Sequence, residues 1–209
     1  MQSNFRDWTL DKIDEAFGLR QVYEMETLTQ LITPSYELND FEKQYIGTLQ
    51  EHFKYGGDDW NEVELENKFI SPMMVLAYKP NDKYAYFLER DLAVKIGEYE
   101  LSGRVDGLIA TGFRNPKKPF FCLNEYKKGT DPNGDPKGQA LIAMLAAQEL
   151  NNNQLPIYGC YVIGRDWYFM VLEDKKYSIS QDYSCVTEEV FEIYKILKNL
   201  NNKVEALVN

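Results

Sequence analysis

The chain of 209 residues contains a single histidine, and this scarcity removes several catalytic chemistries at once. Ser-His and Cys-His catalysis both need a histidine base beside the nucleophile. His52 lies in a segment with helical periodicity, distant in sequence from the other reactive side chains. Zinc sites with histidine ligands are excluded for the same reason.

Cysteine is also scarce. The three cysteines, Cys122, Cys160 and Cys185, are odd in number, widely spaced and set in apolar sequence. A disulfide framework or a cysteine zinc site needs paired or closely spaced residues, so we expect reduced thiols in the core.

Long hydrophobic runs and nucleotide-binding loops are missing as well. No apolar stretch approaches the ~18 residues that a membrane span needs, and residues 1–6 lack the apolar run of a signal peptide. We therefore expect a soluble cytoplasmic protein with no membrane partner. Neither Gly-x(4)-Gly-Lys-Ser/Thr nor Gly-x-Gly-x-x-Gly occurs, so nucleotide hydrolysis and dinucleotide binding have no basis in this sequence.

Positive charge is in short supply, because 23 basic residues face 33 acidic ones and the net charge is −10. Proteins that bind nucleic acid usually gain affinity from Lys and Arg, so this balance opposes tight binding. The charge is unevenly spread, however. Residues 114–137 hold six basic and three acidic residues, which makes this window +3 and the remainder −13.

The hydrophobic fraction of 44% and the length predict one folded core, preceded by an N-terminal appendage. Residues 1–57 have helical patterns and are expected to form a helical extension: Thr9 caps a helix that stops at Gly18, a second helix spans 21–32, and Asn39 with Glu42 resembles a capping box. Residues 58–209 are expected to form the main domain.

The main domain alternates between the two secondary-structure types. A helix from Trp60, which Pro72 would bend or restart, precedes strand-like runs over 84–96, 99–111 and 119–127, typical of an antiparallel meander. An Ala-rich helix over 138–150 follows, then strands over 157–163 and 167–172, and a last amphipathic helix capped by Thr187. The predicted class is α/β.

Polar residues interrupt two of these strands where chemistry could occur. Asp106 lies on the second strand, and Glu125 and Lys127 lie on the third. Alternation along a strand places Glu125 and Lys127 on one face and Tyr126 on the other, and pairing of the strands would add Asp106 to that face. Two carboxylates beside one ammonium can hold a hard divalent cation and orient a water or a phosphate oxygen.

This motif, in this order of elements, resembles the PD-(D/E)XK nuclease superfamily, the fold of many restriction endonucleases. The resemblance covers about residues 60–172. Within it, residues 61–72 are similar to the first helix of the nuclease-like domains at the N-termini of type I restriction motor subunits and of related bacterial proteins. Val105 stands where the signature proline would be.

The resemblance implies a restriction-endonuclease-like core and a role for each matching residue. Asp106 and Glu125 would ligate Mg²⁺ or Mn²⁺ beside the carbonyl oxygen of Tyr126, and Lys127 would position or activate the attacking water. Glu64 would contact a metal-bound water or a second metal, and it is favoured over its neighbours Glu62 and Glu66 because it precedes Leu65 at the edge of the apolar stripe.

The family glutamine near the scissile phosphate corresponds to Gln139, which is expected in the first turn of the helix after the third strand. The implied function is hydrolysis of DNA in defence or repair, by a homodimer or a larger restriction-type assembly. Two alternatives stay open: an inactive nuclease fold that binds nucleic acid or protein, and an acidic interaction subunit.

Overall fold

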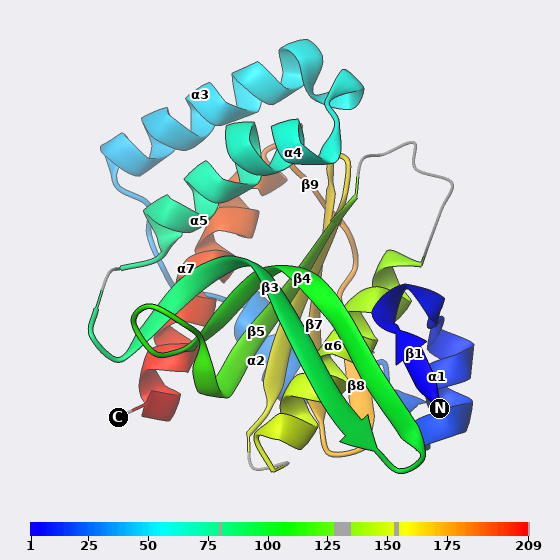
Figure 1. Cartoon of the computed structure of the whole chain (residues 1–209). Helices are drawn as coiled ribbons and strands as arrows, with labels where there is room; N and C mark the ends of the chain where they lie inside the picture. Colours follow the sequence, from blue (N-terminus) through cyan, green and yellow to red (C-terminus); the bar gives the residue numbers. More distant parts are fainter. Residues whose placement is uncertain (80, 128–134, 153–154, 209) are drawn as a thin grey trace.

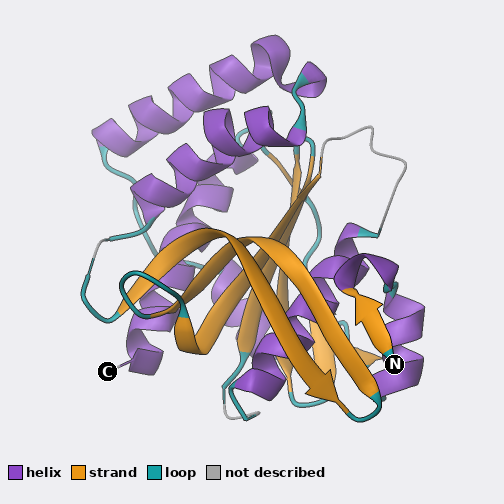
Figure 2. Cartoon of the chain, in the orientation of Figure 1, coloured by secondary structure: helices purple, strands orange, loops and turns teal. Residues whose placement is uncertain are grey.

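The computed structural model describes residues 1–79, 81–127, 135–152 and 155–208. In these ranges the chain forms one mixed sheet of nine strands covered by helices on both faces, which confirms the predicted α/β class (Figures 1 and 2). The strands are β1 (Gln2–Asn4), β2 (Arg20–Gln21), β3 (Tyr84–Ile96), β4 (Tyr99–Thr111), β5 (Lys117–Lys127), β6 (Ile157–Ile163), β7 (Asp166–Glu173), β8 (Lys176–Ile179) and β9 (Tyr183–Ser184).

The helices include several short or irregular turns. They are η1 (Phe5–Asp7), α1 (Leu10–Phe17), α2 (Glu26–Ile32), α3 (Asp40–Gly56), η2 (Gly57–Asp59), α4 (Glu62–Leu65), η3 (Glu66–Ile70), α5 (Ser71–Ala77), α6 (Pro136–Leu150) and α7 (Glu189–Val208). None of the helices in the described ranges is long and apolar enough to cross a membrane.

The centre of the sheet follows the predicted strand pattern. β3, β4 and β5 form an antiparallel meander, and the strands expected over 84–96 and 99–111 have those bounds. β5 then pairs in parallel with β6, and α6 connects them, because parallel neighbours need a long crossover. β6, β7 and β8 continue as antiparallel neighbours.

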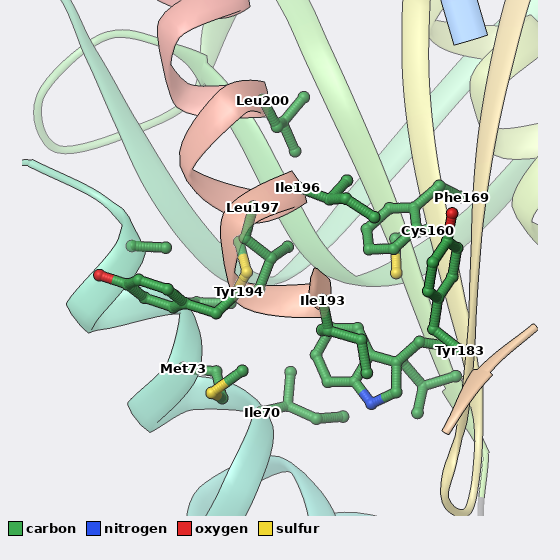
Figure 3. Close-up of a cluster of buried hydrophobic side chains, with 14 of the residues drawn as sticks. Ile70, Met73, Cys160, Phe169, Tyr183, Ile193, Tyr194, Ile196, Leu197 and Leu200 are labelled. Carbon is green, nitrogen blue, oxygen red and sulfur yellow. The ribbon is translucent and has the colours of Figure 1, made fainter. Parts of the chain in front are cut away.

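Side chains of alternating residues fill a hydrophobic layer on each face of the sheet. On β7, Trp167, Phe169 and Val171 belong to one layer, with α2 to α5 and α7, whereas Met170 and Leu172 belong to the other, with η1, α1 and α6. Figure 3 shows the first layer, where α7 side chains such as Ile193 and Ile196 point toward the sheet. The protein is therefore built of three layers.

Residues 1–57 contribute strands as well as the predicted helices. β1 pairs in parallel with β4, and β2 pairs in parallel with β8, so this segment extends the same sheet. The helix expected over 21–32 begins only at Glu26, because Gln21 lies in β2. The capping box of Asn39 and Glu42 is confirmed. Strands of two or three residues have too little sequence for alternation to be recognised.

The helix that leads to the sheet contains a wide π-type turn. The Ser71 N–H donates to the Glu66 carbonyl, five residues earlier, and Pro72 follows in the first turn of α5. Proline has no N–H to continue the regular pattern, which explains why an irregular turn precedes it. The sequence predicted a bend at Pro72, and the structure places the irregularity one turn before it.

The thiols agree with the expectation of reduced core cysteines as far as the structure describes them. Cys160 and Cys185 are both buried thiols. The side chain of Cys122 lies outside the described part of the chain.

Candidate active site

Asp106, Glu125 and Lys127 converge where β4 and β5 separate. The two strands pair through Gly107 and Asn124, so the next positions along them, Asp106 and Glu125, lie side by side. The backbone N–H of Tyr126 donates to Asp106 Oδ2 at 2.6 Å, and Lys127 Nζ lies 2.9 Å from Glu125 Oε1. The structure thus brings together the carboxylate pair and the ammonium group that the sequence singled out.

These charged groups are shielded from solvent. Glu125 is 6% exposed and Lys127 is 8% exposed, while Asp106 is partly buried. Burial raises the pKa of Asp106 to about 6, although the Tyr126 N–H and the Lys127 charge both lower it. Burial, followed by the charge of Asp106, raises the pKa of Glu125 to about 7. Ionisation of both carboxylates is therefore energetically unfavourable in this site, and a bound cation would stabilise the ionised forms.

Lys127 is held in its charged form by the surrounding carboxylates. Its burial lowers its pKa, but the ion pair with Glu125, together with Asp106 and Glu62, outweighs this and raises the pKa overall. Glu62 Oε1 lies 3.4 Å from Lys127 Nζ. The ammonium group bridges carboxylates of the sheet and of α4, so its position depends on both elements.

Glu62 and Glu66 are the first-helix carboxylates near this group, and the sequence interpretation missed them. Burial, and then the charges of Asp106 and Glu89, raise the pKa of Glu66. A signal was present in the sequence: Glu62 and Glu66 are four residues apart and share the helical stripe of Leu65 and Phe69, which packs on the sheet.

The structure does not bring Glu64 to this group. Its Oε1 lies 2.6 Å from Lys68 Nζ, and its other oxygen accepts from the Asn61 N–H in a capping box. Two residues along a helix correspond to a rotation of about 200°, so Glu64 points away from the side on which Glu62 and Glu66 lie. These contacts hold the pKa of Glu64 below its usual value, the Lys68 hydrogen bond being the main cause.

Gln139 is buried in the first turn of α6, as expected, but it lines a different hollow. With Asp91, Gly103, Arg104 and residues of η1 it borders an open pocket of about 750 Å³. Asp106, Glu125 and Lys127 are not among the described residues that border this pocket. Gln139 is thus placed beside the part of the β3–β4 hairpin where Asp91 and Leu92 pair with Arg104 and Gly103.

The donor set fits a hard divalent cation better than zinc. Within the described ranges, no group of three or more His, Cys, Asp or Glu side chains is arranged to hold a metal ion. Magnesium, however, is commonly held by one or two carboxylates, with water and substrate oxygens completing the shell. The N–H and C=O of a strand residue point to the same neighbouring strand, so the Tyr126 carbonyl faces the Asp106 side and adds a third oxygen.

No protein-family model matches the chain, and a search of curated proteins finds no match. The resemblance to the PD-(D/E)XK superfamily therefore rests on the residues and the order of elements.

Proposed function

We propose that this protein is a metal-dependent nuclease that hydrolyses phosphodiester bonds in DNA, with a restriction-endonuclease-like core. The observation that carries the proposal is the convergence of two shielded carboxylates, Asp106 and Glu125, with the Lys127 ammonium at the point where β4 and β5 separate. The raised pKa values of both carboxylates are typical of groups arranged for function.

Each residue has a role that follows from its chemistry. Asp106, Glu125 and the Tyr126 carbonyl would hold Mg²⁺ or Mn²⁺, which supplies Lewis acidity and an activated water at neutral pH when bound. Lys127 stays protonated next to the pair, so its role is to orient a water or stabilise charge on a phosphate oxygen. Glu62 holds Lys127 in place from α4.

The element order supports the proposed core. A helix, the β3–β4–β5 meander, the α6 crossover and the β6–β7 pair follow one another as that fold requires, with the parallel contact between β5 and β6. β1, β2, β8 and β9 are additions at the borders of this arrangement.

The acidic composition favours one rival, an inactive nuclease fold that binds a partner without cutting. A net charge of −10 opposes tight binding to DNA, and the carboxylates near Lys127 add to the repulsion. An inactive fold predicts no metal binding at Asp106, which separates the two functions.

Calorimetric titration with Mn²⁺ and nuclease assays with Mg²⁺ or Mn²⁺ test the proposal together. Wild type should bind the ion and cleave DNA, and Asp106→Asn and Glu125→Gln should lose both properties because each removes a charged ligand. Asp91→Asn is the matched control, since Asp91 is an exposed aspartate that pairs with Arg104. Cleavage at the wild-type rate by Asp106→Asn would show that the site is wrong, and absence of metal binding by wild type would favour the inactive fold.

A further inference from the structure

A basic surface with an exposed aromatic ring lies at the end of the meander where β4 finishes. Phe113 is 82% exposed in the turn between β4 and β5. Five exposed basic residues lie on the segments that meet there: Lys79, Lys83, Arg114, Lys117 and Lys118. We call these six residues the basic end.

Strand pairing brings the segments of the basic end together. Thr111, the last residue of β4, pairs with Tyr84 on one side and with Lys117 on the other. Lys83 precedes Tyr84, and Phe113 follows Thr111 by two residues. In Figure 1 the loop before β3 and the turn between β4 and β5 lie next to each other at the left of the view.

The turn that presents Phe113 depends on glycine. Gly112 has φ of +102°, and a Cβ there would lie 2.3 Å from the Asn115 carbonyl oxygen. Only glycine adopts this conformation without strain, so the tight turn is built into the sequence. The ring of Phe113 is carried outward from the sheet on this turn and is left uncovered.

Three cations of the basic end carry charge that no salt bridge within the described ranges offsets. Arg114, Lys117 and Lys118 form no salt bridge with any residue in the described part of the chain. Asp82 precedes Lys83 in the loop before β3, and the charge of Glu205 acts on Tyr84, the first residue of β3. Such a group of cations, on a chain of net charge −10, makes a local region of positive potential, which attracts anions.

The basic end is separate from the candidate active site. Lys117 begins β5 and Lys127 ends it, and at about 3.3 Å per residue the two lie roughly 30 Å apart. The single basic window of the sequence is thereby divided between the two ends of one strand.

We propose that the basic end binds single-stranded nucleic acid. Lysine and arginine side chains would contact successive phosphates, and Phe113 would stack on one base. The ring selects a single strand because base faces inside a duplex are covered by their neighbours. That the bound strand is the substrate of the nuclease rests on the proposed function, whereas the binding itself does not require Asp106.

Fluorescence anisotropy in EDTA, with a labelled oligothymidine of about 20 nucleotides and a duplex of the same length, tests this binding. Wild type should bind the single strand more tightly than the duplex. Phe113→Ala should weaken binding to the single strand roughly 5- to 100-fold, the effect of losing one base stack. The triple variant R114Q/K117Q/K118Q should reduce the slope of log binding constant against log salt concentration by about 2, because each single-strand phosphate contact contributes about 0.7 to this salt slope.

The control variant R20Q/K43Q/K176Q removes the same charge from exposed positions on other elements and should keep the wild-type salt slope. Asp106→Asn should bind the single strand as tightly as wild type does. Absence of cleavage in a nuclease assay would therefore contradict the proposed function and not the binding at the basic end. The substituted side chains are exposed, and circular dichroism would verify that the variants fold as wild type does. Equal binding by wild type, Phe113→Ala and the triple variant would overturn the proposal, as would duplex binding as tight as single-strand binding, or binding only to vesicles of anionic lipid.

Discussion

Replacing Asp106 with asparagine should stabilise the protein at high pH when no metal is present. The pKa of Asp106 is raised from 3.8 to about 6, chiefly by burial. A group with a raised folded pKa contributes stability that is fully present below the unfolded value and is lost as pH rises through the folded value. Asp106 is therefore fully ionised above about pH 7, where its negative charge destabilises the folded protein. Asparagine removes this charge.

The size of the effect follows from the pKa. One pKa unit corresponds to about 1.4 kcal/mol, so the charged form of Asp106 costs roughly 3 kcal/mol at pH 8. Asparagine recovers only part of this, about 1 to 2 kcal/mol, because its amide N–H groups replace a carboxylate oxygen at a shielded position and would need hydrogen-bond acceptors there. The side-chain carbonyl oxygen of the introduced asparagine can still accept from the Tyr126 N–H. Linkage predicts that this gain falls by about 1.4 kcal/mol between pH 8 and pH 5 and by about 2.4 kcal/mol by pH 4, so little or none of it remains below about pH 5.

Urea unfolding in EDTA, followed by tryptophan fluorescence, measures this gain. Trp8 and Trp167 lie in different hydrophobic layers, so the signal covers both faces of the sheet. Asp91→Asn serves as the control, because the pKa of Asp91 is lowered by Arg104 and the same change should not stabilise the protein at pH 8. Added Mn²⁺ should stabilise wild type but not Asp106→Asn, by about 2.7 kcal/mol at 100 times Kd. A loss of stability for Asp106→Asn at pH 8, or a gain of equal size at pH 4, would refute the reasoning.

Three further substitutions give separate tests. Lys127→Ala should keep or tighten Mn²⁺ binding in calorimetry, because a like charge is removed, while the rate of DNA cleavage falls roughly 10²-fold or more. Glu62→Gln should lower the pKa of Lys127, seen as a shift in the pH–rate profile, whereas Glu64→Gln should leave the profile unchanged because Glu64 pairs with Lys68. Gly103→Ala should cost about 1 to 3 kcal/mol in urea unfolding, since the added Cβ would lie 2.4 Å from the Phe5 ring; unchanged stability would mean that this contact is not tight.

Local chemistry determined the elements that the sequence could predict. Runs rich in Tyr, Phe, Val, Ile and Leu, punctuated by glycines, marked β3, β4 and β6 with their bounds, and the Asn39 capping box marked the start of α3. Alternation along a strand placed Glu125 and Lys127 on one face, because it depends only on neighbours in the chain. Asp106 joined them once the antiparallel pairing of β4 with β5 was assumed.

Tertiary structure decided the features that depend on contacts between distant segments. β1 and β2 exist because β4 and β8 offer them free edges, and neither has a pattern of its own. Glu62 and Glu66, instead of Glu64, face the carboxylate pair because the rotation of α4 is set by packing of Leu65 and Phe69 on the sheet. Gln139 borders the β3–β4 hairpin because the docking of α6 on the sheet fixes where its first turn lies. The basic window is divided because β5 is long enough to carry its two ends far apart. Both outcomes depend on many residues at once.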